Sequence, residues 1–191
     1  MQSDRRYDMI KDKRSPRFLR KGESETNSTV ITRRCLSFCR KTPTRARRIA
    51  AVCRLLPWLC VALYGALLLY YVICFDWPRM LRVTLIPLSA LVVGSVFRAV
   101  LNCPRPYDVD RKITPLLSHH SGRSFPSRHC VSACVIATAF WYTNLWLGVV
   151  TACMALCVAV SRVLCGVHFV KDVLAGLLFG FGWGALFFSI F

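Results

Sequence analysis

Apolar residues dominate the chain from about residue 49 to residue 191, and only short polar segments interrupt them. A helix needs about 20 apolar residues to cross a hydrocarbon core of about 30 Å. By this length criterion the pattern predicts five membrane-spanning helices, at about residues 55–75, 81–97, 131–145, 146–160 and 173–191. We therefore expect an all-α, multi-pass integral membrane bundle of five helices, or six if a further membrane element lies near the N-terminus. If the protein is bacterial, this membrane is the cell membrane.

The first 48 residues have the opposite character, because they are polar and strongly basic. The whole chain carries 26 Lys and Arg against 9 Asp and Glu, for a net charge of +17. This asymmetry predicts a disordered basic tail over residues 1–48 and a transmembrane domain over residues 49–191. Basic residues beside membrane spans commonly face anionic lipid head groups, at about 1 kcal/mol each. We expect such lipids, rather than nucleic acid, as partners of the tail.

Three polar segments of the apolar region contain clustered ionisable residues. They are residues 98–108, 124–130 and 161–172. If the last four spans alternate in direction, all three segments fall at one face of the membrane, and the turns at the opposite face carry little chemistry. Ionisable groups are costly beside hydrocarbon unless they are paired or functional. The pattern therefore predicts one site at one membrane face.

The segment SRVLCGVHFVKD, residues 161–172, contains a spaced pair of titratable groups. His168 and Asp172 are four residues apart, so on a helix they share a face and can form a hydrogen bond. An aspartate that holds one imidazole nitrogen leaves the other free as a nucleophile or base. If the last helix begins near His168, its N-terminus also favours an anion. Gly166 permits the turn, and Arg162 offers the planar donors that suit phosphate.

The other two segments add groups of the same kind. Pro126 fits the first turn of a helix, which would direct Ser127 and nearby backbone N–H groups toward an anion. His129 follows and could deliver a proton. Arg98 and Arg105 are seven residues apart, so both can reach the same rim. An arginine near the end of an apolar span, as Arg98 is, is a functional candidate.

Arginines, histidines, a serine and an aspartate at one membrane face indicate a phosphate site. The few acidic residues are scattered and form no pattern typical of a magnesium site. None of the 11 cysteines has the spacing of a zinc site. We therefore expect neither a metal nor another cofactor. Arginines would neutralise the phosphoryl group, one histidine would attack it, and the other would protonate the leaving oxygen.

These residues resemble three signatures of the type 2 phosphatidic acid phosphatase (PAP2) superfamily, KxxxxxxRP, PSGH and SRxxxxxHxxxD. Here they read RAVLNCPRP at 98–106, PSRH at 126–129 and SRVLCGVHFVKD at 161–172. The third matches at every specified position. The three occur in the family's order, and the resemblance covers about residues 55–191.

The resemblance implies a helical membrane fold and metal-independent hydrolysis of a lipid phosphate through a phosphohistidine. The substrate would be phosphatidate-like or a polyprenyl diphosphate. By position, His168 would be the nucleophile, Asp172 its orienting partner and His129 the general acid. The residues that would bind phosphate are Arg98, Arg105, Ser127, Arg128 and Arg162.

Two positions depart from the family pattern. Arg98 replaces the usual lysine, which keeps the charge and changes the geometry. Arg128 replaces the usual glycine, so it adds bulk and charge where a phosphate would come close to the backbone. It could contact the phosphate or crowd the site. If Arg128 crowds the site, the alternative is a non-catalytic membrane scaffold that binds anionic lipid or a partner through its basic tail. A haloperoxidase is disfavoured because those proteins are soluble.

The side of the membrane that the site faces has two conflicting indications. Five spans put the basic tail and the site at the same face, and the positive-inside rule would make that face cytosolic. The resemblance implies a six-helix protein with its site facing away from the cytosol. A sixth membrane element, an outward-facing tail or an inverted member would each reconcile the two.

Overall fold

The computed structural model describes residues 27–117 and 121–191. Within these residues every regular secondary-structure element is a helix, and no strand occurs. The helices are α2 (Asn27–Arg40), α3 (Pro43–Ile73), α4 (Trp77–Leu101), α5 (Pro106–Val109), α6 (Arg128–Thr143), α7 (Leu145–Leu164) and α8 (Val170–Ile190). Each of the five predicted spans corresponds to one of the longer helices, α3, α4, α6, α7 and α8, so the predicted fold class is confirmed.

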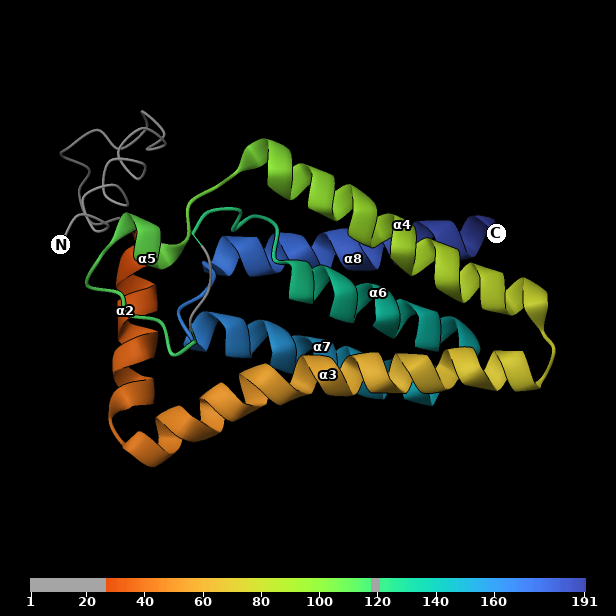
Figure 1. Cartoon of the computed structure of the whole chain (residues 1–191), viewed down its shortest axis with the longest axis horizontal. Helices are drawn as coiled ribbons and strands as arrows, with labels where there is room; N and C mark the ends of the chain where they lie inside the picture. The colour runs from red at the N-terminus through yellow and green to blue at the C-terminus, as the bar shows by residue number, and fades with distance from the viewer. Residues whose placement is uncertain (1–26, 118–120) are drawn as a thin grey trace, which may run out of the picture.

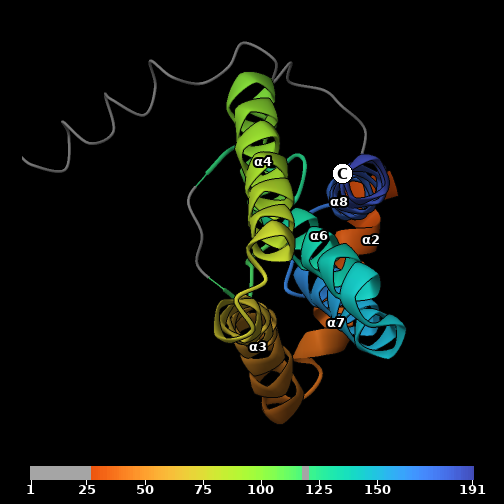
Figure 2. The same cartoon turned by 90° about the vertical axis from the view of Figure 1, so that its right-hand side faces the viewer.

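These five helices run along the length of the molecule, and α6 lies among the others (Figures 1 and 2). Helix α6 packs against α7, α8 and α4. Its buried residues include Val131, Val135, Ala139 and Phe140. It has 16 residues, which at about 1.5 Å per residue is shorter than a hydrocarbon core. Four helical segments in the described part of the chain are long and apolar enough to cross a membrane: Pro43–Ile73, Trp77–Val109, Leu145–Leu164 and Val170–Ile190.

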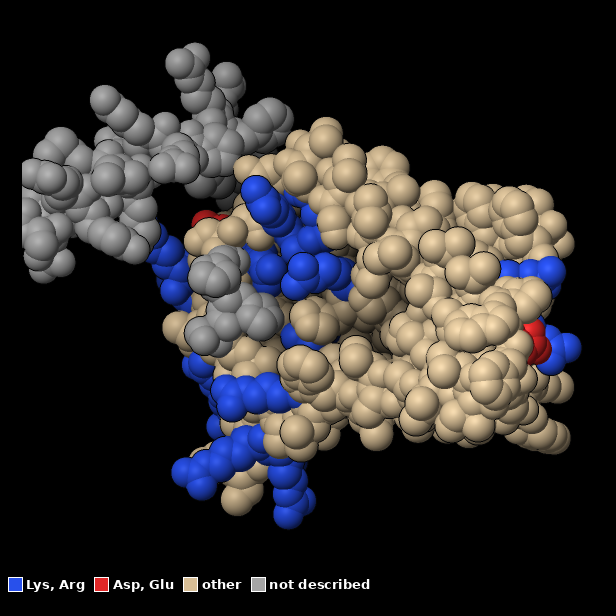
Figure 3. Space-filling model, turned by 45° about the vertical axis from the view of Figure 1, so that its right-hand side comes forward, with Lys and Arg blue, Asp and Glu red and all other residues tan. Residues whose placement is uncertain are grey.

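The outer faces of these four segments are apolar. Large side chains that are at least two-thirds exposed include Leu55, Trp58, Val100, Trp146 and Leu178. Exposed apolar surface of this extent is typical of a protein surrounded by lipid. Figure 3 shows a broad surface without Lys or Arg, and basic side chains gathered around a hollow at one end. Most of the basic side chains in this view therefore lie at one end of an apolar bundle, and a smaller charged group lies at the other end.

Small residues bring α8 close to α6. Gly176, Gly180 and Gly184 are spaced four residues apart along α8, and a Cβ atom at Gly176 would lie 2.8 Å from the backbone oxygen of Ser127. A Cβ atom at Gly180 would lie 2.7 Å from the backbone oxygen of Val131. Such small-residue stripes allow close packing of membrane helices. The backbone N–H of Ser127 consequently donates to the carbonyl of Asp172 at 2.9 Å, so the starts of α6 and α8 are joined.

The prediction of a disordered tail over residues 1–48 is wrong for residues 27–48. Helix α2 covers Asn27–Arg40, and α3 begins at Pro43 and continues through residue 49 without a break. Residues 1–26 lie outside the described residues. The buried positions of α2 are Thr29, Thr32, Leu36 and Cys39, which follow a helical period. Two of them are threonines, and the many basic residues hid this amphipathic pattern.

Helix α2 crosses the end of the bundle instead of running along it (Figure 1). Arg33 pairs with Asp110, and Arg40 donates to the carbonyl of Thr114 at 2.6 Å. Leu36 lies close to Gly166, since a Cβ atom added at Gly166 would lie 2.7 Å from Cδ1 of Leu36. Gly166 has φ of +70°, a conformation that glycine adopts without strain. Helix α2 is therefore packed on the turn that carries His168.

Candidate active site

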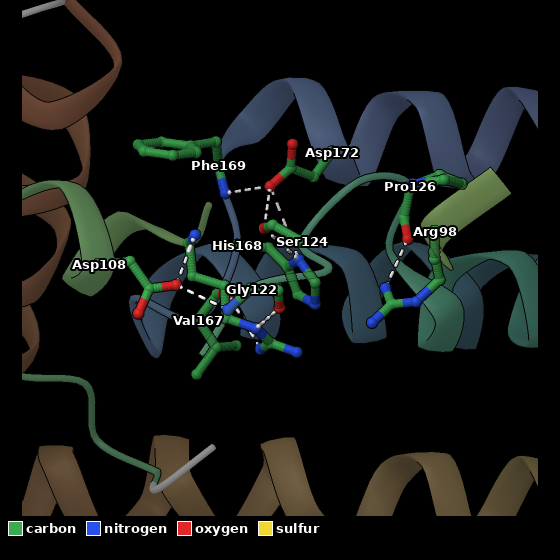
Figure 4. A network of polar contacts seen from close by, with 10 residues as sticks. Arg98, Asp108, Gly122, Ser124, Pro126, Val167, His168, Phe169 and Asp172 are labelled. Atoms are coloured by element: carbon green, nitrogen blue, oxygen red, sulfur yellow. Dashed lines mark hydrogen bonds and ion pairs between the residues drawn. The ribbon is translucent and has the colours of Figure 1, made fainter. Parts of the chain in front are cut away.

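The three polar segments predicted from the sequence meet at the end of the bundle that α2 crosses. The first is the end of α4 and the start of α5, and the second is the loop that leads into α6. The third is the turn between α7 and α8. Figure 4 shows side chains from all three segments within one network of polar contacts. The expected convergence of these segments is confirmed.

The centre of the site is a chain of three buried side chains, Asp172, Ser124 and His168 (Figure 4). The hydroxyl of Ser124 donates to Oδ2 of Asp172, and its oxygen lies 3.2 Å from Nδ1 of His168. The same Oδ2 accepts the backbone N–H of Phe169 at 3.1 Å. Nδ1 of His168 lies 3.7 Å from that Oδ2, which is too far for a direct hydrogen bond. Ser124 thus connects the aspartate to the histidine.

This arrangement selects one tautomer of His168. A serine hydroxyl has one proton, and Ser124 gives it to Asp172, so toward His168 its oxygen can only accept. Nδ1 must then carry the proton, and Nε2 keeps a free lone pair. Burial, together with the charges of Arg105 and Arg98, lowers the pKa of His168 to about 4, although Asp172 partly opposes them. The imidazole is therefore neutral at neutral pH, as a nucleophile requires.

Arg105 joins the loop before α6 to the turn before α8. Its Nε donates to the carbonyl of Gly122 at 3.0 Å, and one terminal nitrogen donates to the carbonyl of Val167 at 3.4 Å. Asp108 supports the same loop, because its Oδ2 accepts the backbone N–H groups of Arg105 and Gly122. A guanidinium has five N–H donors, so Arg105 keeps donors for an anion. Arg98 likewise uses one nitrogen on the carbonyl of Pro126 at 2.7 Å.

Arg162 and Ser127 contribute buried donors without partners. Arg162 donates from a terminal nitrogen to the carbonyl of Cys53 at 3.0 Å. Within the described part of the chain, its Nε and the hydroxyl of Ser127 have no hydrogen-bond partner. A buried unsatisfied polar group costs about 1–3 kcal/mol. Oxygens of a bound phosphoryl group could satisfy both donors, so the residues present fit an anion.

His129 and Arg128 occupy the first turn of α6. Together with Arg162 they line a pocket of about 250 Å³ between α3 and α6. Arg128 is exposed and His129 is half-buried. Arg128 therefore stands at the edge of a pocket and is not packed into the centre of the site.

Three local expectations are corrected. Pro126 precedes the N-cap residue Ser127, so it lies before α6 and not in its first turn. Helix α8 begins at Val170, so His168 lies in the preceding turn. His168 and Asp172 consequently do not share a helical face, and Ser124 bridges them.

Sequence reasoning also missed three residues, Ser124, Asp108 and Arg54. Ser124 and Asp108 make the contacts described above, and Arg54 of α3 lines the pocket beside Arg128. None of the three belongs to a signature. Arg54 had a signal, since it is a charge within an otherwise apolar stretch.

Two curated proteins match part of the chain. Undecaprenyl-diphosphatase BcrC of Bacillus subtilis (strain 168) is 32% identical over 101 residues, which are 53% of this chain and 52% of BcrC. The putative undecaprenyl-diphosphatase YbjG of Escherichia coli (strain K12) is 42% identical over 66 residues, 34% of this chain and 33% of YbjG. The chain thus spans about half the length of the first relative and a third of the second.

Two solved structures share the fold. LpxE of Aquifex aeolicus superposes with a TM-score of 0.70 at 22% identity, over 87% of this chain and 98% of LpxE. A transmembrane PAP2-type phosphatidylglycerolphosphate phosphatase of Bacillus subtilis gives a TM-score of 0.64 at 26% identity, over 85% of this chain and 83% of that protein. Together with the four long apolar helices, this likeness identifies an integral, multi-pass membrane protein.

The sequence profile of one family covers more than half of the chain. It matches residues 79–191, a region that contains all three signatures and every predicted site residue. The polar network, the helical fold and this match agree: the chain belongs to the PAP2 superfamily.

Proposed function

We propose that this protein is a lipid phosphatase that hydrolyses a phosphate ester or diphosphate at the membrane surface, without a metal, through a phosphohistidine on His168. The observation that carries the proposal is the chain of contacts from Asp172 through Ser124 to His168. These contacts leave Nε2 of the neutral His168 imidazole unprotonated, and Arg105 and Arg98 act on it electrostatically. The names of the matched relatives, undecaprenyl-diphosphatases and a phosphatidylglycerolphosphate phosphatase, support a lipid phosphate as substrate.

In the first step, Nε2 of His168 attacks the phosphorus atom and the bond from phosphorus to the leaving oxygen breaks. His129 gives its proton to that oxygen, so the lipid product leaves without an additional negative charge on it. Arg98, Arg105 and Arg162 stabilise the charge that develops on the equatorial oxygens. Asp172 stabilises the positive charge on the imidazole through Ser124.

In the second step, water attacks the phosphorus atom of the phosphohistidine. His129, now neutral, accepts a proton from that water, and the bond between phosphorus and Nε2 breaks. Inorganic phosphate leaves, and His129 is again protonated for the next cycle. Each proton is thus returned, and the residues of this chain suffice for both steps.

The test is release of phosphate by the purified full chain from phosphatidate, diacylglycerol pyrophosphate and prenyl diphosphates. The proposal expects release from at least one of them, undiminished by a chelator and abolished in His168→Ala. Undiminished release by His168→Ala would contradict the mechanism, and loss of activity in the chelator would contradict its metal-free character. Lipid binding without turnover by the unmodified protein would support the scaffold alternative instead.

A further inference from the structure

The pocket between α3 and α6 has a cationic end and an apolar interior. Its lining includes Arg54, Arg128, His129 and Arg162, and also apolar side chains of α3 and α6: Pro57, Trp58, Val61, Ala133 and Ile136. Both helices begin at the site end of the bundle. Val61 is seven residues beyond Arg54, and Ile136 is eight beyond Arg128. At about 1.5 Å per residue, each apolar wall extends roughly 10 Å past its arginine.

This pocket adjoins the candidate active site. It shares Arg162 and His129 with the proposed machinery. Arg128 also acts electrostatically on Arg98, whose other charged neighbours include Arg105 and Asp172. A ligand in the pocket would therefore contact Arg162 and His129, two residues that the proposed mechanism also uses at the attacked phosphoryl group.

Two of these arginines are not needed to hold the attacked phosphoryl group. Arg98, Arg105, Arg162 and Ser127 already surround that position with donors. Arg54 and Arg128 are exposed at the mouth of the pocket, and they add two positive charges on its outer side. In the described part of the chain neither arginine forms an ion pair with a carboxylate, and two positive charges that line one pocket favour a further anionic group.

We propose that Arg54 and Arg128 form a subsite for the second phosphoryl group of a lipid diphosphate. This inference rests on the proposed function and specifies its substrate class. The terminal phosphoryl group lies at His168, and the inner one lies between Arg54 and Arg128. The first carbons of the lipid chain run along Trp58 and Ile136 into the apolar part of the pocket.

The order of groups also assigns the bond that breaks. His168 attacks the terminal phosphorus, and the bond from that phosphorus to the bridging oxygen breaks. His129, which lines the same pocket, protonates the bridging oxygen. The lipid monophosphate leaves, water then hydrolyses the phosphohistidine, and inorganic phosphate is the second product. After the first step Arg54 and Arg128 stay with the leaving monophosphate, which makes that lipid a product and a poor substrate.

The test compares binding of two unreactive probes by the purified full chain in lipid nanodiscs. One probe is a prenyl methylenebisphosphonate, and the other is the matching prenyl monophosphonate. The protein should bind the bisphosphonate at least tenfold more tightly. Arg54→Gln and Arg128→Gly should each reduce that preference about tenfold or more, since a hydrogen bond to a charged group contributes that much. Arg79→Ala removes an exposed arginine at the opposite end of the bundle and should leave the preference unchanged.

Equal binding of both probes by the unmodified protein would overturn the subsite. The same preference in both arginine variants as in the Arg79→Ala control would also overturn it. Because both probes resist hydrolysis, the result does not depend on turnover. A protein that prefers the bisphosphonate and releases no phosphate from any lipid would keep the subsite and contradict only the proposed function.

Discussion

The Oγ atom of Ser124 lies 3.2 Å from Nδ1 of His168, although the two residues are 44 positions apart in the chain. The same hydroxyl donates to Asp172, which lies 3.7 Å from the imidazole. The aspartate therefore acts on the histidine through a serine hydroxyl. In the proposed mechanism Ser124 is a positioning residue, because it fixes the tautomer of His168, the proposed nucleophile.

Replacement of Ser124 by alanine should lower kcat about tenfold to hundredfold, which corresponds to loss of one hydrogen bond to a charged group. The ¹⁵N chemical shifts of the His168 imidazole should show a mixture of tautomers in this variant and a single tautomer, protonated at Nδ1, in the unmodified protein. Ser121→Ala, in the same loop at an exposed position, serves as the control. Retention of the single tautomer in Ser124→Ala would contradict the role of Ser124.

The pH dependence of activity should reflect the lowered pKa of His168. Burial, with help from Arg105 and Arg98, brings this pKa to about 4 from the ordinary value of 6.5. Because the neutral form attacks in the proposed mechanism, the acid limb of kcat/KM should lie near pH 4. A limb centred near 6.5 would contradict a buried nucleophile.

The same shift links His168 to stability. Between pH 4 and 6.5 the folded protein binds fewer protons at His168 than the unfolded chain does. The contribution of His168 to the free energy of unfolding should therefore be fully present above pH 6.5 and be lost as the pH falls toward 4. Thermal unfolding of the purified protein and of His168→Gln across this range measures the contribution, and the variant should show a weaker dependence on pH.

The glycine stripe of α8 should be sensitive to a single added methyl group. Gly176→Ala would place a Cβ atom 2.8 Å from the backbone oxygen of Ser127, so α8 must move away from α6. Overpacking of this kind costs about 1–3 kcal/mol, and it would separate Asp172 from the loop that carries Ser124. Gly182→Ala is the matched control, because nothing lies within 4 Å of its added Cβ atom. We expect a lower Tm and lower activity in Gly176→Ala only; equal effects of the two changes would contradict the proposed packing.

Helix α2 should support the turn that contains His168. Leu36→Ala would remove the side chain that lies on Gly166, and truncation of a buried leucine costs about 2–5 kcal/mol. Thermal unfolding and phosphate release should both show a loss. Ile31→Ala changes a half-exposed apolar residue of the same helix and should have little effect. If Leu36→Ala and Ile31→Ala had equal effects on thermal unfolding and phosphate release, α2 would not support the site.

The parts of the structure that the sequence predicted are those with local signals. Long apolar runs predicted five helices, and the spacing of the three signatures predicted the groups that converge at one end. The role of Ser124 was not predicted because its partners lie in another segment, and a lone serine in a loop has no distinctive pattern. Helix α2 was not predicted because two of its four buried residues are threonines and basic residues dominate its composition. Arg54 could have been found, since an arginine in an apolar helix needs a partner or a function.

The most direct test of the account is the capture of the covalent intermediate. The purified protein, mixed with a lipid phosphate or diphosphate labelled with ³²P at the terminal phosphorus and quenched within milliseconds, should carry an acid-labile, base-stable label on the peptide that contains His168. His129→Ala should release the lipid product slowly and show the same labelled peptide, whereas His168→Gln should carry no label. Phosphate release at an undiminished rate by His168→Gln, or a label on a residue other than His168, would contradict the account.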